Sequence, residues 1–157
     1  MSDLRSTINT AMKTAMKEKD AVSLSTIRLI SAAIKERDIS ARSASGQDGI
    51  ADEEVLSLLQ SMIKQRQESS RIYREGSRDD LAEREEAEIG VIQGFLPEQL
   101  SETEIDDAVA GLIAEVGAES IKDMGKVMAA LKTQYAGKLD MARASAVVKE
   151  KLGWLIN

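Results

Sequence analysis

The sequence predicts an all-helical protein, and three observations support this fold class. The chain of 157 residues has one proline, and its aromatic residues are limited to one tryptophan, two tyrosines and one phenylalanine. Its apolar residues are therefore mainly leucine, isoleucine, methionine, valine and alanine, a composition that suits helices better than a strand-rich sandwich. Apolar positions also recur every three or four residues, and capping residues separate the periodic segments. A chain of this length can bury one ordinary core or two small helical units.

Two helices are expected at the N-terminus, over residues 2–18 and 21–38. Their apolar stripes are formed by Leu4, Ile8, Met12 and Ala15 in the first helix and by Leu24, Ile27, Ile30 and Ile34 in the second. The first helix also carries Arg5, Lys13 and Lys17 among serines and threonines, which is typical of transit peptides. The helical spacing favours a core helix instead. The polar stretch 40–51 is predicted to be a flexible loop.

The middle of the sequence predicts two long antiparallel helices. Asp52 is expected to cap the first helix, and Gly76 to end it. Ser77 and Asp80 are interpreted as the capping box of the second helix, which ends before Pro97. In this arrangement residues whose numbers sum to about 154 lie opposite each other. The register pairs Ile63 with Ile92 and Arg66 with Glu88.

Three shorter helices are expected in the last third of the chain. Ser101 and Glu104 form a capping box for the first of them, and Ser120 with Asp123 repeat the pattern for the second. The helices are expected to end at Gly117 and Gly137, and the last helix is marked by Met141, Ala144, Val148 and Leu152. The predicted architecture is therefore N-terminal helical hairpins with long helices, in residues 1–97, followed by a small three-helix bundle in residues 98–157.

Charge is distributed unevenly along a chain of net charge −6. Residues 79–117 contain twelve acidic and one basic residue, whereas residues 118–157 contain seven basic and four acidic ones. The end of the chain is thus expected to present a local basic surface on an acidic protein. Any nucleic-acid binding there should be weak and sensitive to salt.

The residue types give little support to catalysis. Histidine and cysteine are absent, which removes the most common general base, thiol nucleophile and zinc ligands. Glu85, Glu86 and Glu88 could suggest a carboxylate metal site, but a solvated face paired with arginines of the preceding helix, Arg66, Arg71 and Arg74, is favoured. No catalytic residue, metal site or cofactor is therefore predicted. No apolar run reaches the roughly 20 residues of a membrane span, and the lack of cysteine leads us to expect a cytoplasmic location.

Glycines within expected helices need a physical reason, because glycine weakens a helix by about 1 kcal/mol relative to alanine. For Gly90 and Gly94, the favoured interpretation is close packing of helices in a soluble core. For Gly125 close packing is also slightly favoured, and close approach of an RNA backbone is the alternative. Gly125 and Lys126 lack the remaining glycine and Ser/Thr positions of a nucleotide-binding loop.

The candidate RNA-binding residues are glycine and cationic residues near the C-terminus, namely Gly125, Lys126, Lys132, Lys138, Arg143 and Lys149. If the cations converge, they can neutralise phosphates without reading sequence. The alternative is ordinary solvation of helix faces, and the sequence does not separate the two. Tyr135 could stack on a base, although packing under the bundle is favoured.

Four segments of the chain resemble YqeY-type proteins: KQRQES at 64–69, YREGSRDDLAEREEAEI at 73–89, FLPEQLSETEI at 95–105 and DMGKVM at 123–128. The tail domain of the B subunit of the tRNA-dependent Asp/Glu amidotransferase is also similar at Gly125, Val127, Met128 and Gly137 and at the ending 148–152. In place of the small residue common after the Gly-Lys step of that tail, this chain has Leu139, Asp140 and Met141. The resemblance implies a helical module associated with tRNA.

The expected function is that of a non-catalytic accessory module that binds or positions tRNA, in connection with amidotransferases that use glutamine as the nitrogen donor. The expected partner is tRNA or a tRNA-handling enzyme. One alternative, implied by the resemblance, is a component of a carbon-nitrogen ligase. The other is a protein-protein adaptor that does not bind RNA.

Overall fold

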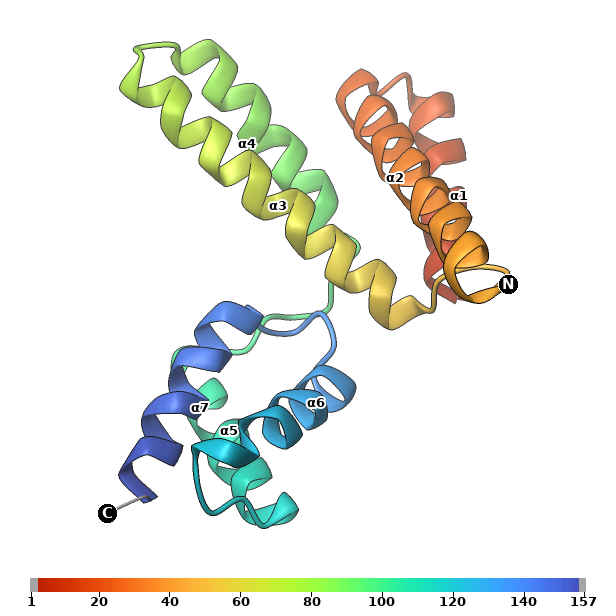
Figure 1. Cartoon of the computed structure of the whole chain (residues 1–157). Helices are drawn as coiled ribbons and strands as arrows, with labels where there is room; N and C mark the ends of the chain where they lie inside the picture. Colours follow the sequence, from red (N-terminus) through yellow and green to blue (C-terminus); the bar gives the residue numbers. More distant parts are fainter. Residues whose placement is uncertain (1–2, 156–157) are drawn as a thin grey trace. The chain divides into compact units, whose positions relative to one another are not determined.

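Figure 1 shows a computed structural model of the chain, which describes residues 3–155. All the regular elements of this part are helices, which confirms the predicted fold class. The chain divides into two compact units, of which the first ends at Leu96 and the second begins at Pro97. Among the helices of the described residues, none has the length and apolar character needed to cross a bilayer.

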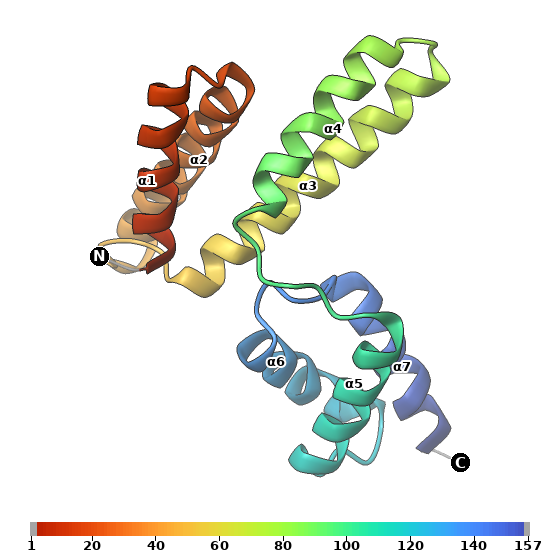
Figure 2. The ribbon, with the colours of Figure 1, turned by 180° about the vertical axis from the view of Figure 1, so that it is seen from behind.

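The first unit opens with a hairpin of α1 (Asp3–Glu18) and α2 (Ala21–Ser45), which lie side by side in Figures 1 and 2. Ile8 and Ala15 of α1 are buried in the core of this unit, so the core-helix interpretation is confirmed. The predicted end of α2 near residue 38 is wrong. Alanine and arginine in the stretch 40–45 are good helix formers, and the helix continues to Gly46, whose φ of 75° closes it.

A second hairpin consists of α3 (Asp52–Glu75) and α4 (Asp79–Gln93). Gly76 follows α3 as predicted, but the predicted capping box of Ser77 and Asp80 is wrong. Ser77 adopts a left-handed φ of 58°, and the N–H of Arg78 donates to the carbonyl of Tyr73 at 2.7 Å. This is a Schellman-type turn, so Ser77 belongs to the end of α3 and cannot also start α4.

The N-cap of α3 also differs from the prediction. Ala51 holds the extended backbone conformation and is the N-cap, without a side-chain cap bond, while Asp52 is the first helical residue. Asp52 therefore supports the helix through the favourable position of its negative charge in the first turn, together with the glutamates that follow it.

The register of the α3–α4 hairpin confirms the predicted pair Arg66 and Glu88. The Arg66 Nε donates to a Glu88 carboxylate oxygen at 3.0 Å, and both side chains are only 13% exposed. Further along the hairpin, Arg74 reaches Glu86 of α4, and the Ser70 hydroxyl donates to the same carboxylate at 3.1 Å. Arg71 differs from the prediction, because it pairs with glutamates of its own helix.

The core of the first unit joins both hairpins. Its fully buried side chains come from all four helices and include Ile8, Ile27, Ile30, Val55, Leu59 and Ile92. At the edge of this core, Arg5 donates to both carboxylate oxygens of Asp38, and the N–H of Ile50 donates to Asp38 at 2.8 Å. Asp38 thereby ties α1 and the loop before α3 to α2.

The predicted close packing of Gly90 and Gly94 is wrong, because neither glycine packs against a neighbouring helix. Both glycines are exposed. A Cβ on Gly90 would meet no atom within 4 Å, and one on Gly94 would meet only carbonyl oxygens of α4 itself. These small residues face an open groove, so a close contact inside the core does not explain them.

The second unit is a small bundle of α5 (Glu102–Val116), the 3-10 turn η1 (Ile121–Asp123), α6 (Met124–Gln134) and α7 (Met141–Leu155). The predicted capping box of Ser101 and Glu104 is present, and Gly117 ends α5 with a φ of 68°. The core contains the predicted stripe of α7 and side chains of the other helices, including Val109, Leu112, Val127, Leu131, Ala144, Val148 and Leu152.

Candidate nucleic-acid interface

The start of α6 is shaped by polar side chains that fold the chain before it. The Ser120 hydroxyl accepts from the N–H of Lys122 at 3.3 Å, and the Asp123 carboxylate accepts from the N–H of Glu119 at 2.9 Å. The second bond is the main reason that the pKa of Asp123 lies below its usual value, and the nearby positive charge of Lys126 adds to the shift. These bonds set the point at which α6 begins.

Gly125 and Lys126 stand in the first turn of α6, and both are exposed. A Cβ on Gly125 would meet no atom within 4 Å. The slightly favoured interpretation, close packing of Gly125 against a helix of this chain, is therefore wrong. The missing side chain leaves the backbone of α6 accessible at this position.

Lys132 and Lys138 lie near the other end of α6. Lys132 is in the last turn of the helix and Lys138 in the loop that follows, and both are exposed. This loop is fixed within the second unit, because the Lys138 carbonyl accepts from the N–H of Leu100 at 2.7 Å and the Gly137 carbonyl accepts from the Gln99 amide at 2.6 Å. Gly137 itself has a φ of 73°. The backbone under Lys138 is thus held in place.

Arg143 and Lys149 both belong to α7 but differ in their surroundings. Arg143 forms an ion pair with Glu102 at the start of α5. Lys149 is exposed. Within residues 3–155, no ion pair is found for Lys149 or for Lys126, Lys132 and Lys138. Four of the five predicted cations are therefore available to a ligand, while Arg143 is engaged inside the unit.

Helix geometry keeps these cations from forming one surface. Lys126 and Lys132 are six positions apart on α6, which places them about 120° apart around the helix axis. The same spacing separates Arg143 and Lys149 on α7. The predicted residues therefore divide into groups at the start of α6, around its C-terminal end and on α7. Phosphates of a large, curved molecule could meet more than one group, whereas a small anion could not.

Sequence reasoning missed Lys122, which is exposed and lies four residues before Lys126. This lysine is visible in the segment KDMGK at 122–126, but it lies in the 3-10 turn η1 and not on α6, so α-helical spacing does not place it on one side with Lys126. Tyr135 is half-buried and packs against the core of the second unit, so the favoured packing interpretation is confirmed. Among residues 3–155, no group of three acidic side chains is arranged to hold a metal ion.

The fold and the site define a small helical protein whose second unit is a helical bundle with exposed lysines. A family model described as Yqey-like protein matches residues 5–152, so the chain belongs to the YqeY-like protein family. The match covers both units.

Curated relatives share the name "Altered inheritance of mitochondria protein 41, mitochondrial". The relative from Pyrenophora tritici-repentis is 32% identical over 147 residues, which cover 90% of this chain and 77% of the relative. The relative from Lachancea thermotolerans is 34% identical over 145 residues, which cover 87% of this chain and 75% of the relative. The relative from Meyerozyma guilliermondii is 40% identical over 90 residues, covering 57% and 44% of the two chains.

These names contradict the expected cytoplasmic location, because the relatives are named as mitochondrial proteins. The expectation depended on the absence of cysteine, which indicates only that the fold needs no disulfide. That feature does not distinguish one reducing compartment from another.

Proposed function

We propose that this chain is a non-catalytic accessory protein whose second unit contacts tRNA, or an enzyme that handles tRNA, through the start of α6. The observation that carries the proposal is the exposed pair Gly125 and Lys126. The glycine has no internal contact that explains it, and the lysine has no ion pair in the described chain. Lys132 and Lys138 supply further positive charge around the same helix.

Contacts of this kind suit a positioning role. A lysine that meets a phosphate contributes charge but no sequence information, and a backbone without a side chain allows close approach. Two or three phosphate contacts give weak binding that falls steeply with salt. The similarity of Gly125, Val127 and Met128 to the amidotransferase tail supports tRNA as the ligand. The residues of the chain itself give no support to a ligation step.

The test is a titration of fluorescently labelled tRNA with the whole protein at salt concentrations between about 50 and 200 mM. Replacement of Lys126, Lys132 and Lys138 by alanine is expected to weaken binding. The slope of log affinity against log salt should also become shallower, by about 1 for each phosphate that the variant no longer neutralises. The fold should survive, because all three side chains are exposed.

A matched control removes the same charge elsewhere. Lys13, Lys17 and Lys35 are exposed lysines of α1 and α2. A variant with all three replaced by alanine has the same net charge as the first variant. It should bind tRNA as the original chain does. Equal loss in both variants would mean that only net charge matters, and unchanged binding by the first variant would contradict the proposal. Absence of tRNA binding by the original chain would favour the adaptor alternative.

A further inference from the structure

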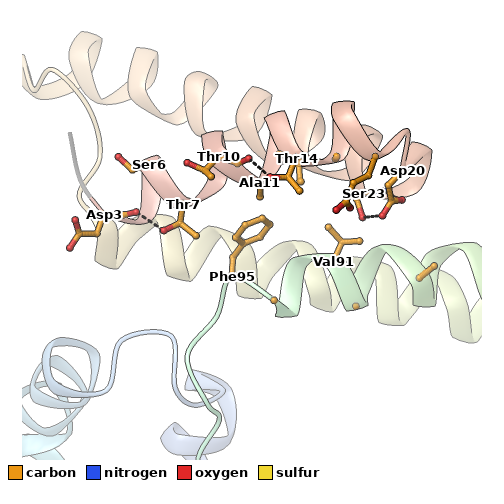
Figure 3. A pocket seen from close by; sticks show the side chains of 16 residues that line it. Asp3, Ser6, Thr7, Thr10, Ala11, Thr14, Asp20, Ser23, Val91 and Phe95 are labelled. Atoms are coloured by element: carbon orange, nitrogen blue, oxygen red, sulfur yellow. Dashed lines mark hydrogen bonds between the residues drawn. The ribbon is translucent and has the colours of Figure 1, made fainter.

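An open groove runs between α1 and α4 in the first unit. None of the described residues along it belongs to the second unit. The volume of the groove is about 1030 Å³, and its walls come from α1, the start of α2 and the end of α4 (Figure 3). Figure 3 shows Val91 and Phe95 extending from the α4 side toward α1, where Ala11 faces them. The groove thus has an apolar floor within a single compact unit.

The α4 wall of the groove is made of small residues. Ala87, Gly90 and Gly94 lie along it at helical spacing, and the space beside Gly90 is free of protein atoms to 4 Å. An occupant can therefore bring its own backbone close to α4, as one helix does when it packs on small residues of another. The register of these glycines fits a helix lying along the groove.

The α1 wall is less polar than its sequence suggests. Thr7 donates its hydroxyl to the carbonyl of Asp3 at 2.8 Å, and Thr14 donates to that of Thr10 at 3.1 Å. The hydroxyls of Thr7 and Thr14 are thus engaged on their own helix and need no hydrogen-bond partner from an occupant. An occupant needs apolar side chains here and few hydrogen-bonding groups.

Charge at the groove has one sign. Asp3 lies at one end of α1, and Glu18 and Asp20 lie at the other, while the described residues that line the groove include no lysine or arginine. The fifteen positions from Asp3 to Glu18 span about 22 Å along a helix. Negative charge therefore marks both ends of an apolar channel about four helical turns long, and it repels the phosphates of RNA.

We propose that this groove binds an amphipathic helix of a partner protein, about four turns long, with a stripe of small and aliphatic residues and with lysine or arginine near both ends. The apolar stripe would cover Val91 and Phe95, and the basic residues would meet Asp3 at one end and Glu18 and Asp20 at the other. Such docking of a helix in a groove is a common mode of peptide recognition. This site is separate from the proposed tRNA contact and does not depend on it.

The probe is a pair of synthetic helical peptides of about 16 residues, long enough to span the groove. Both carry alanine and leucine on one face. One has lysines in its first and last turns, and its twin has glutamates there. Fluorescence anisotropy with the whole protein is expected to show at least tenfold tighter binding of the lysine peptide at low salt, with the difference decreasing as salt rises.

Gly90→Leu places a side chain in the groove, and its Cβ would meet no atom within 4 Å. We expect this variant to unfold at the same or higher temperature and to bind the lysine peptide at least tenfold more weakly. Gly111→Leu is the matched control, since Gly111 is an exposed glycine of α5 with equally open surroundings, and it should bind normally.

Three results would overturn the proposal: no binding of the lysine peptide, equal binding of both peptides, or undiminished binding by Gly90→Leu. Each of these results would leave the tRNA proposal unaffected, because the groove and the proposed tRNA contact are formed by different residues.

Discussion

In the α3–α4 hairpin, arginine side chains cross from one helix to the carboxylates of the other, whereas in the second unit lysines extend from α6 and α7 without such partners. Arg66 meets Glu88 and Arg74 meets Glu86. In the second unit only Arg143 is paired in this way in the part of the chain that the structure describes. The comparison teaches that positive charge joins two helices by ion pairs in one region and remains available to a ligand in the other.

Arg66→Ala should give the largest effect and tests the structural half of the comparison. The change leaves the Glu88 carboxylate, which is 13% exposed, with the more exposed Arg84 at 3.7 Å as its remaining ion pair. Removal of one partner of a mostly buried pair costs about 2–4 kcal/mol of unfolding free energy. Urea denaturation measures this loss. Lys132→Ala in the second unit should stay within about 0.5 kcal/mol, and equal losses in the two variants would break the comparison.

Asp38→Asn should give an intermediate effect that depends on pH. The hydrogen bond from Arg5 is the main cause that lowers the pKa of Asp38, so the carboxylate stabilises the fold above its unfolded pKa of about 3.9. We expect the variant to lose about 1–3 kcal/mol at neutral pH, because a charge-assisted bond is lost. As pH falls through the lowered pKa, the two proteins should become equally stable.

The pH profile of unfolding midpoints measures this convergence. Asp106 is an exposed aspartate of α5, so the profile of Asp106→Asn should run parallel to that of the original chain. If the unfolding midpoints of Asp38→Asn and the original chain differed by a constant amount down to about pH 2, ionisation of Asp38 would not be the cause of the stability difference.

Gly125→Ala should have the smallest effect on stability and sharpens the binding half of the comparison. Alanine favours the helix by up to about 1 kcal/mol, and the site has room for a methyl group. The variant should therefore be as stable as the original chain or more so, yet bind tRNA more weakly. Thermal unfolding and tRNA titration measure the two effects, with Gly111→Ala as a control that should change stability alone. Full tRNA affinity in Gly125→Ala would contradict the proposal that Gly125 allows RNA to approach the backbone of α6 closely.

The sequence predicted the helices and much of their packing because these depend on local periodicity. The apolar stripe of α7 and the capping box at Ser101 and Glu104 needed only residues close in the chain. The pair Arg66 and Glu88 followed from one assumption, an antiparallel turn near Gly76. Where a helix pair is joined by a short turn, the turn alone fixes which residues meet.

Other features depend on choices that the sequence leaves open. Whether Ser77 caps α4 or completes the turn after α3 is decided by backbone angles, and the left-handed φ of Ser77 excludes the cap. The role of Gly90 required knowledge of how α1 lies beside α4. The sequence left open whether Lys126 and Lys132 converge, and α6 holds them on one helix about 120° apart around its axis.

The short connection between α3 and α4 also bears on how the chain acquires its structure. Only Gly76, Ser77 and Arg78 separate the two helices, so little chain entropy is lost when they come together. Contacts that are local in sequence form fast. We expect this hairpin to assemble early, even while the ribosome is still producing the second unit, and to give the helices synthesised before it a surface on which to dock.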